Sequence, residues 1–143
     1  MGAYHGDTTP EEAWETLSRE PGAALVDVRT AAEWTYVGLP DLSRTKAPLL
    51  RIEWQTYPSN EVNPAFVAMV DEALRRAGLA PDAPVFFLCR SGVRSAAAAA
   101  AMAAAGYSHC YNVVGGFEGP RDASGHRGSV EGWKAAQLPW VQY

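Results

Sequence analysis

The stretch Val85 to Ala105 reads VFFLCRSGVRSAAAAAAMAAA, and it decides the fold. Its first four residues are apolar and include two aromatic rings, which predicts a short buried strand. The alanine-rich run after Ser95 predicts a helix, because alanine has the highest helix propensity. A strand that turns sharply into a helix directs N–H groups and the positive end of the helix dipole at one spot. Cys89 begins this turn, so we expect its sulfur to lie over those donors as a thiolate.

The residues of the turn are typical of a site that handles anions. Gly92 permits a positive φ, two arginines add positive charge, and two serines add hydroxyl donors. A purely structural cysteine is the alternative, but it explains neither the arginines nor the glycine. The candidate site therefore has Cys89 as the nucleophile and, as the substrate-binding loop, Arg90, Ser91, Gly92, Val93, Arg94 and Ser95.

The run from Cys89 to Ser95 resembles the active-site loop of the rhodanese family, which are persulfide-forming sulfurtransferases. Asp27-Val28-Arg29 followed by Glu33-Trp34 is similar to an early signature of that family. The segments 113–117, 132–133 and 138–139 are similar to its closing part. The resemblance covers about residues 9 to 139. It implies a Cys89 persulfide, a small anionic donor such as thiosulfate, and a thiol, cyanide or protein-cysteine acceptor, with no cofactor and no metal.

Strands and helices alternate along the chain. Capping boxes at Thr9 and Thr30 predict two helix starts, and Asn63-Pro64 predicts a third. Apolar runs at 24–28 and 110–114 predict further buried strands, and 49–54 is strand-like. This order is typical of the α/β class, with an open, mostly parallel sheet and helices on both faces. We expect residues 1–143 to form a single rhodanese-like domain, with the site at the carboxyl edge of the sheet.

Two segments depart from the family pattern. The residues 37–42 lack the histidine of the family's usual Gly-His-Ile-Pro-Gly-Ala, and we expect a loop there. A polar insertion spans about 118–131. It is either a solvated loop or a flap beside the pocket.

Asp27 is a polar residue in an otherwise apolar strand and therefore needs hydrogen-bond donors. Two interpretations stay open: donors from the loop after Cys89, or a capping role at the helix that starts near Thr30. Arg29 and Glu33 are expected to form a local ion pair.

Composition limits the partners and the compartment. The 143 residues carry a formal net charge of −4, which does not suggest a nucleic-acid surface. Two cysteines form neither a disulfide framework nor a metal pair. The first ten residues are polar and lack the apolar stretch of a signal peptide, and the alanine run is about half the length that a bilayer requires. We therefore expect a cytoplasmic protein with no membrane contact.

Three rival functions stay open beside sulfur transfer. Cysteine phosphatases place five residues between the cysteine and an arginine, whereas Cys89 and Arg94 are separated by four, which favours a cradle for one sulfur atom. A non-catalytic interaction module would be expected to lack the nucleophile. Redox sensing would need Cys110 as the resolving thiol, and Cys110 is expected to be a buried, inert thiol. His109 and His126 are expected to be structural or surface residues.

Overall fold

The computed structural model describes residues 4–142, so expectations about Met1 to Ala3 and about Tyr143 lie outside the described residues. The elements in chain order are β1 (Gly6–Thr8), α1 (Pro10–Arg19), β2 (Ala24–Asp27), α2 (Ala31–Tyr36), β3 (Leu39–Pro40), β4 (Leu49–Arg51), α3 (Phe66–Arg76), β5 (Val85–Leu88), α4 (Val93–Ala104), β6 (Cys110–Val113) and β7 (Trp140–Val141).

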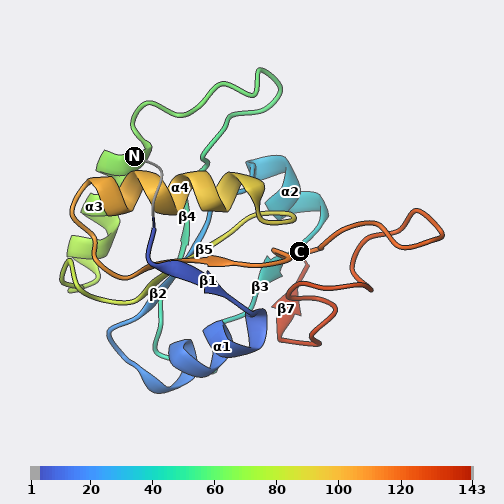
Figure 1. Ribbon diagram of the computed structural model, residues 1–143, viewed down its shortest axis with the longest axis horizontal. Helices are drawn as coiled ribbons and strands as arrows, with labels where there is room; N and C mark the ends of the chain where they lie inside the picture. Colours follow the sequence, from blue (N-terminus) through green and yellow to red (C-terminus); the bar gives the residue numbers. More distant parts are fainter. Residues whose placement is uncertain (1–3, 143) are drawn as a thin grey trace.

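Five of the strands form one sheet in the order β1-β6-β5-β2-β4, and every pair in it is parallel. Helices α3 and α4 lie on one face and α1 lies on the other (Figure 1). The predicted α/β class, with helices on both faces of a mostly parallel sheet, is confirmed. Strand β5 is central, so the cysteine that follows it leaves the middle of the carboxyl edge.

The central strand is apolar throughout because it is buried on both sides. Val85 and Phe87 join the core cluster beneath α3 and α4. Phe86 and Leu88 join a second cluster, which contains Leu17 of α1. Continuous apolar runs are expected for strands of a parallel sheet that is covered on both faces.

The short elements differ from the sequence-based expectations. Residues 39–40, expected in a loop, form β3, which pairs antiparallel with β7, and β1 was not expected at all. Helix α3 begins at Phe66, because Asn63 first closes a turn by accepting the N–H of Ala65 with its side chain at 3.0 Å. Strands of two or three residues contain too little periodicity to be detected.

Asp27 and Arg29 form a fully buried ion pair with 0% exposure for both side chains. The guanidinium donates to the Asp27 carboxylate from Nε at 2.9 Å and from Nη2 at 2.6 Å, and Nη2 also donates to the Gly38 carbonyl at 2.8 Å. Both interpretations of Asp27 and the expected pairing of Arg29 with Glu33 are therefore wrong. The Arg29 guanidinium, two residues along the chain, donates two parallel hydrogen bonds to the Asp27 carboxylate. The backbone N–H groups at a helix N-terminus carry no full charge and offer no such paired donors.

Replacing Arg29 by Met should lower the free energy of unfolding by about 3–5 kcal/mol, because the Asp27 carboxylate is then buried without a partner. Urea unfolding followed by tryptophan fluorescence measures the change. The double variant Asp27→Asn, Arg29→Met should recover part of the loss. Wild-type stability in the single variant would contradict the role given to this pair.

Candidate active site

The polypeptide turns from β5 into α4 through the cysteine loop, residues 89–92. Gly92 has a φ of 118°, in the left-handed region that the sequence predicts for it. This conformation turns the Gly92 N–H back to Cys89 Sγ at 3.1 Å. Ser95 Oγ, one turn into the helix, lies 3.2 Å from the same sulfur. The sulfur thus has one backbone donor and one hydroxyl beside it at the positive end of α4.

The expectation that several N–H groups converge on the sulfur is only partly met. In residues 4–142, Gly92 is the residue whose backbone N–H donates to Sγ. The N–H groups of Arg90 and Ser91 find no acceptor in this part of the chain. They stay available for a group that arrives at the sulfur.

Arg94 forms a bidentate ion pair with Glu33, with Nη1 at 2.7 Å and Nη2 at 3.0 Å from the two carboxylate oxygens. Burial opposes the charge of Glu33, but the hydrogen bonds and charge of Arg94 outweigh it and lower the pKa of Glu33. Burial likewise opposes the charge of Arg94, while Glu33 raises the pKa of the guanidinium above its ordinary value. Binding of an anionic donor by Arg94 stays a prediction: Arg94 lines the cleft, and Glu33 compensates its charge.

The cysteine loop is fixed from behind by the residues that follow β6. The Cys89 carbonyl accepts the Phe117 N–H at 2.8 Å, and the Arg90 carbonyl accepts those of Glu118 and Gly119, both at 3.0 Å. A Cβ on Gly116, whose φ is 61°, would stand 2.5 Å from the Cys89 carbonyl oxygen. Only glycine allows this approach.

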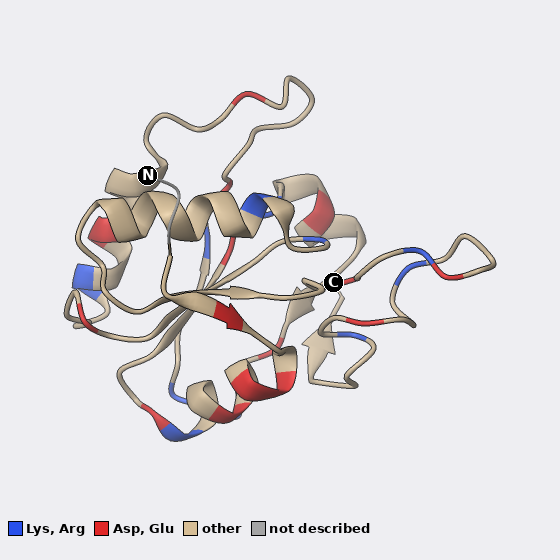
Figure 2. Cartoon of the chain, in the orientation of Figure 1, with Lys and Arg blue, Asp and Glu red and all other residues tan. Residues whose placement is uncertain are grey.

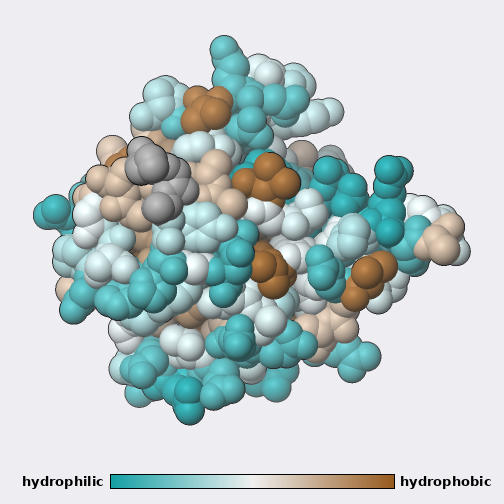
Figure 3. All heavy atoms as spheres, in the orientation of Figure 1, coloured by the Kyte–Doolittle hydropathy of each residue, from teal (hydrophilic) through white to brown (hydrophobic). Residues whose placement is uncertain are grey.

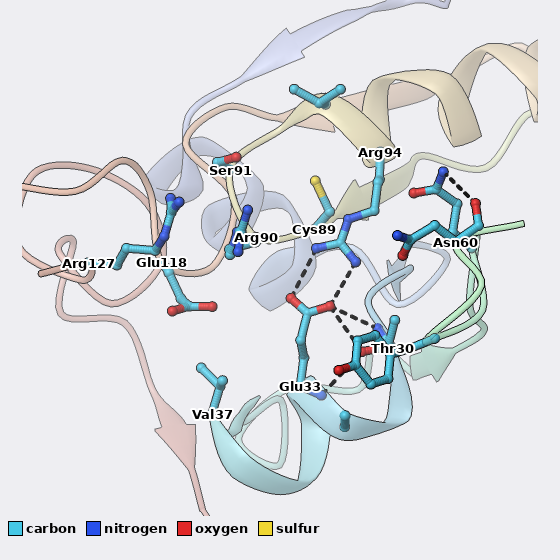
Figure 4. A pocket seen from close by; sticks show the side chains of 14 residues that line it. Thr30, Glu33, Val37, Asn60, Cys89, Arg90, Ser91, Arg94, Glu118 and Arg127 are labelled. Carbon is cyan, nitrogen blue, oxygen red and sulfur yellow. Dashed lines mark hydrogen bonds and ion pairs between the residues drawn. The ribbon is translucent and has the colours of Figure 1, made fainter. Parts of the chain in front are cut away.

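Cys89 lies at the floor of a cleft of about 690 Å³ and is itself only 1% exposed. Five of the seven predicted site residues line this cleft, whereas Gly92 and Ser95 lie beneath it. Figure 4 shows the side chains of Arg90, Arg94 and Glu33 around the sulfur, with Glu118 and Arg127 at one side. The lining residues are Thr30, Ala32, Glu33, Val37, Gln55, Tyr57, Asn60, Cys89, Arg90, Ser91, Val93, Arg94, Glu118 and Arg127.

The insertion, residues 118–131, projects from the sheet edge next to the site (Figure 1). Asp122 organises its tip by accepting from the Ser124 and His126 N–H groups at 2.9 Å each and from Ser129 Oγ at 2.8 Å. Arg127 donates to the Gly119 carbonyl at 2.7 Å. Most of residues 121–130 are exposed, as expected of a solvated loop, while Glu118 and Arg127 line the cleft. The interpretation of the insertion as a flap beside the pocket stays a prediction.

Charge is distributed unevenly over the molecule. Acidic positions are frequent along α1, whereas basic positions lie at the start of α4 and along the insertion (Figure 2). Of these, Arg94 and Arg127 line the cleft. In residues 4–142, neither Arg90 nor Arg127 forms an ion pair with a carboxylate. With the Glu33–Arg94 pair balanced, these two arginines and the carboxylate of Glu118 leave the cleft lining with a net positive charge.

Cys110 is far from Cys89. It opens β6 opposite Val85, at the other end of β5, and four strand residues separate the two positions by about 13 Å. A disulfide needs Cα atoms within about 7 Å. Burial raises the pKa of the Cys110 thiol to about 12, which agrees with the expectation of an inert thiol.

His109 and His126 lie outside the cleft. His109 shares a hydrogen bond of 3.0 Å with Ser108, and His126 is exposed in the insertion. Within the described part of the chain, no three His, Cys, Asp or Glu side chains are grouped so that they could hold a metal ion.

Sequence reasoning missed four residues in and beneath the site. Glu33 was assigned to a capping box, which it does form with Thr30, and this role concealed its pairing with Arg94. Tyr57 and Asn60 come from a loop with no motif. Asn112, a polar residue within an apolar strand, gave a signal of the same kind as Asp27.

The Glu33–Arg94 pair makes stability depend on pH. Because the pKa of Glu33 is lowered by folding from its ordinary 4.5, the pair contributes stability above pH 4.5 and loses it as the pH falls through the lowered value. Glu33→Gln should therefore reduce the free energy of unfolding at pH 7, with a difference from wild type that shrinks towards pH 3. Urea unfolding at both pH values tests this, with the exposed Glu20→Gln as control. A difference that is equal at both pH values would contradict it.

Comparison with known proteins places the chain among described families. The family described as the STR4 middle domain matches residues 5–143. An uncharacterized protein of Rickettsia rickettsii is 38% identical over 129 residues, which cover 90% of this chain and 91% of that protein. The thiosulfate sulfurtransferase GlpE of Actinobacillus succinogenes is 31% identical over 133 residues, covering 93% of this chain and 87% of GlpE.

Solved structures agree with this placement. Rv0390 from M. tuberculosis has a TM-score of 0.87 and 48% identity, covering 99% of this chain and 100% of that chain. A rhodanese-like domain protein from Staphylococcus aureus has a TM-score of 0.52 and 21% identity, over 78% of this chain and 87% of that chain. The second likeness concerns the fold alone.

Proposed function

Because the chain belongs to the STR4 middle-domain family and has a rhodanese-like fold, we propose that it is a sulfurtransferase that carries sulfane sulfur on Cys89. The observation that carries the proposal is the position of Cys89 Sγ. The sulfur lies at the floor of the cleft, accepts the Gly92 N–H at 3.1 Å and faces the start of α4. These surroundings favour a thiolate nucleophile.

The proposed reaction has two displacement steps. The Cys89 thiolate attacks the outer sulfur of thiosulfate, the S–S bond of the donor breaks, and sulfite leaves with the electron pair. The enzyme then holds a persulfide, whose terminal sulfur is anionic. An acceptor thiolate or cyanide attacks that sulfur, the bond to Sγ breaks, and the Cys89 thiolate is restored. Neither step needs a redox partner, a metal or a cofactor.

The charges of the cleft support an anionic donor. Arg90 and Arg127 have no carboxylate partner within residues 4–142, so they are the groups that attract it. Backbone N–H groups of the cysteine loop act as fixed donors to the negative persulfide. Arg94, held by Glu33, keeps the loop in shape.

The size of the cleft favours a thiol acceptor over cyanide. Pockets of 300–1,000 Å³ hold drug-sized ligands, and this cleft of about 690 Å³ is larger than thiosulfate or cyanide requires. Its rim presents Val93, which is 80% exposed, and Tyr57, which is 70% exposed. These apolar surfaces suit the organic part of a thiol, as a small molecule or as a protein cysteine.

The rival functions receive less support from the geometry. A phosphatase needs an arginine whose two nitrogens bind the phosphate, but both Arg94 nitrogens bind Glu33. Redox sensing through Cys110 is opposed by its place at the far end of β5. On the face in Figure 3, hydrophobic side chains stand singly among hydrophilic ones, unlike the apolar patch of many interaction modules.

We propose that the protein acts in the cytoplasm, without contact to a membrane or to nucleic acid. Among the helices of residues 4–142, none has the length and apolar character needed to span a bilayer.

Replacing Cys89 by Ser should abolish thiosulfate-dependent sulfur transfer, because an alcohol at this position cannot accept the sulfane sulfur. Intact mass after thiosulfate treatment should show one added sulfur in the wild type and none in the variant. Cys110→Ser is the matched control and should keep both the added sulfur and most of the turnover.

Two outcomes would reject the proposed function. One is full activity in Cys89→Ser. The other is robust hydrolysis of an aryl phosphate that depends on Cys89, which would favour the phosphatase instead.

Replacing Arg127 by Ala should raise the KM for thiosulfate about two- to fivefold and leave kcat nearly unchanged, because a single half-buried charge that solvent still screens contributes modestly to anion binding. Arg121→Ala is the control: Arg121 lies on the same insertion but lines a neighbouring hollow instead of the cleft. Steady-state kinetics with thiosulfate distinguish the two. Equal effects of both substitutions would show that only the overall charge of the insertion matters.

A further inference from the structure

A chain of hydrogen bonds leads from the reactive sulfur to the edge of the sheet. Ser95 Oγ lies 3.2 Å from Cys89 Sγ and 2.6 Å from Asn112 Oδ1. Asn112 Nδ2 lies 3.3 Å from Asp7 Oδ1. The same Asp7 oxygen accepts the Tyr4 hydroxyl at 2.7 Å.

The register of the sheet fixes this arrangement. Asn112 of β6 is the direct partner of Asp7 in β1 and of Phe87 in β5. Its side chain passes beneath the cysteine loop, where the amide nitrogen would be 3.8 Å from a Cβ on Gly92. Ser95 is fully buried and Asn112 is 6% exposed, so these two side chains depend on each other for hydrogen bonds.

The direction of the hydrogen bonds follows from the chemistry of Asp7. A carboxylate only accepts, so Asn112 must turn its NH₂ group to Asp7 and its carbonyl oxygen to Ser95. The serine hydroxyl has one proton, and that proton is donated to Asn112. Towards the sulfur, Ser95 can then only accept: it can receive the S–H of a thiol but cannot donate to a thiolate.

We propose that Asn112, oriented by Asp7, is a positioning residue that withholds the Ser95 proton from Cys89. The inference rests on the proposed function, since it concerns the same nucleophile. A thiolate with fewer hydrogen bonds is more basic and, once formed, more nucleophilic. Asn112 and Asp7 therefore determine both the fraction of Cys89 that is thiolate and the rate at which that thiolate attacks. Ser95 can donate to an anionic sulfur only by leaving Asn112.

Other charges also act on Cys89 and must stay constant in a test. The cysteine loop and α4 contribute Arg90 and Arg94, α2 contributes Glu33, and the insertion contributes Glu118 and Arg127. None of these side chains hydrogen-bonds to Asn112 or Asp7 within residues 4–142. Substitutions at positions 7 and 112 thus leave these five charges in place and act on the chain of hydrogen bonds from Cys89 through Ser95 and Asn112 to Asp7, which we call the relay. Asn112→Leu alters no charge, whereas Asp7→Asn also removes one negative charge, so Asn112→Leu and its Ser95→Ala background carry the test.

The test is the pH profile of Cys89 alkylation by iodoacetamide, followed by mass spectrometry. Asn112→Leu removes the competing acceptor, so Ser95 is free to donate to the thiolate. The alkylation midpoint should fall by about one pH unit, while the rate of the fully ionised thiolate decreases. In a Ser95→Ala background, the same substitution should move the midpoint no further, because the effect needs the serine proton.

A milder variant guards against a folding defect. Asp7 is exposed, and Asp7→Asn lets Asn112 turn its amide over and release Ser95, so the midpoint should fall in the same direction. Tyr4→Phe is the control, since it leaves the carboxylate and the polarity of the relay intact, and the midpoint should stay at the wild-type value.

An unchanged or raised midpoint in both Asn112→Leu and Asp7→Asn would overturn the proposal. A further drop when Asn112→Leu is added to Ser95→Ala would do the same. Alkylation requires no sulfur donor, so the two proposals fail separately. If the wild type takes up no sulfur but the midpoints shift as stated, the sulfurtransferase function is rejected and the relay stands.

Discussion

The buried ion pair between Asp27 and Arg29 is the interaction on which the other parts of the site depend. Its guanidinium joins the end of β2 to the Gly38 carbonyl and stacks on the Phe117 ring, with 4.3 Å from Cζ to the ring centroid. Phe117 in turn donates its N–H to the Cys89 carbonyl. Burying two charges is costly unless each is well paired. The remaining nitrogen, Nη1, has no hydrogen-bond partner in residues 4–142 but belongs to the group that faces the aromatic ring.

The arginines of the cleft differ in whether a carboxylate pairs with them. The sequence predicts Arg94 as part of the substrate-binding loop together with Arg90. In the structure Nη1 and Nη2 of Arg94 bind Glu33, and this ion pair joins α2 to α4. The side chains of this ion pair are 19–20% exposed. Because its two charges cancel, the pair holds α4 against α2 but adds little net positive charge to the cleft. Arg90 and Arg127 form no ion pair within residues 4–142. Arg90 is exposed, and Arg127 is half-buried and donates to the Gly119 carbonyl. The cleft thus has one arginine that is fixed by an ion pair and two that are not.

The sheet register connects the site to distant parts of the chain. Asp7 and Asn112 are paired strand residues, 105 positions apart in sequence, and they determine which way the Ser95 hydroxyl points. Gly116 connects β6 to the cysteine loop through a contact too close for any side chain. Backbone and buried polar groups therefore contact the cysteine loop from the side of the sheet, whereas Cys89 also lines the cleft.

Much of the fold and the centre of the site were determined by the sequence itself. The run from Val85 to Ala105 specifies strand, turn and helix through local propensity and a glycine with positive φ, and both are properties of adjacent residues. The tertiary structure alone decided the partners: Glu33 for Arg94, Arg29 for Asp27, and the orientation of Asn112. Each of these side chains could satisfy its polar groups locally in several ways, and only packing and strand register select one. The short strands β1, β3 and β7 likewise form because a neighbouring strand completes their hydrogen bonds.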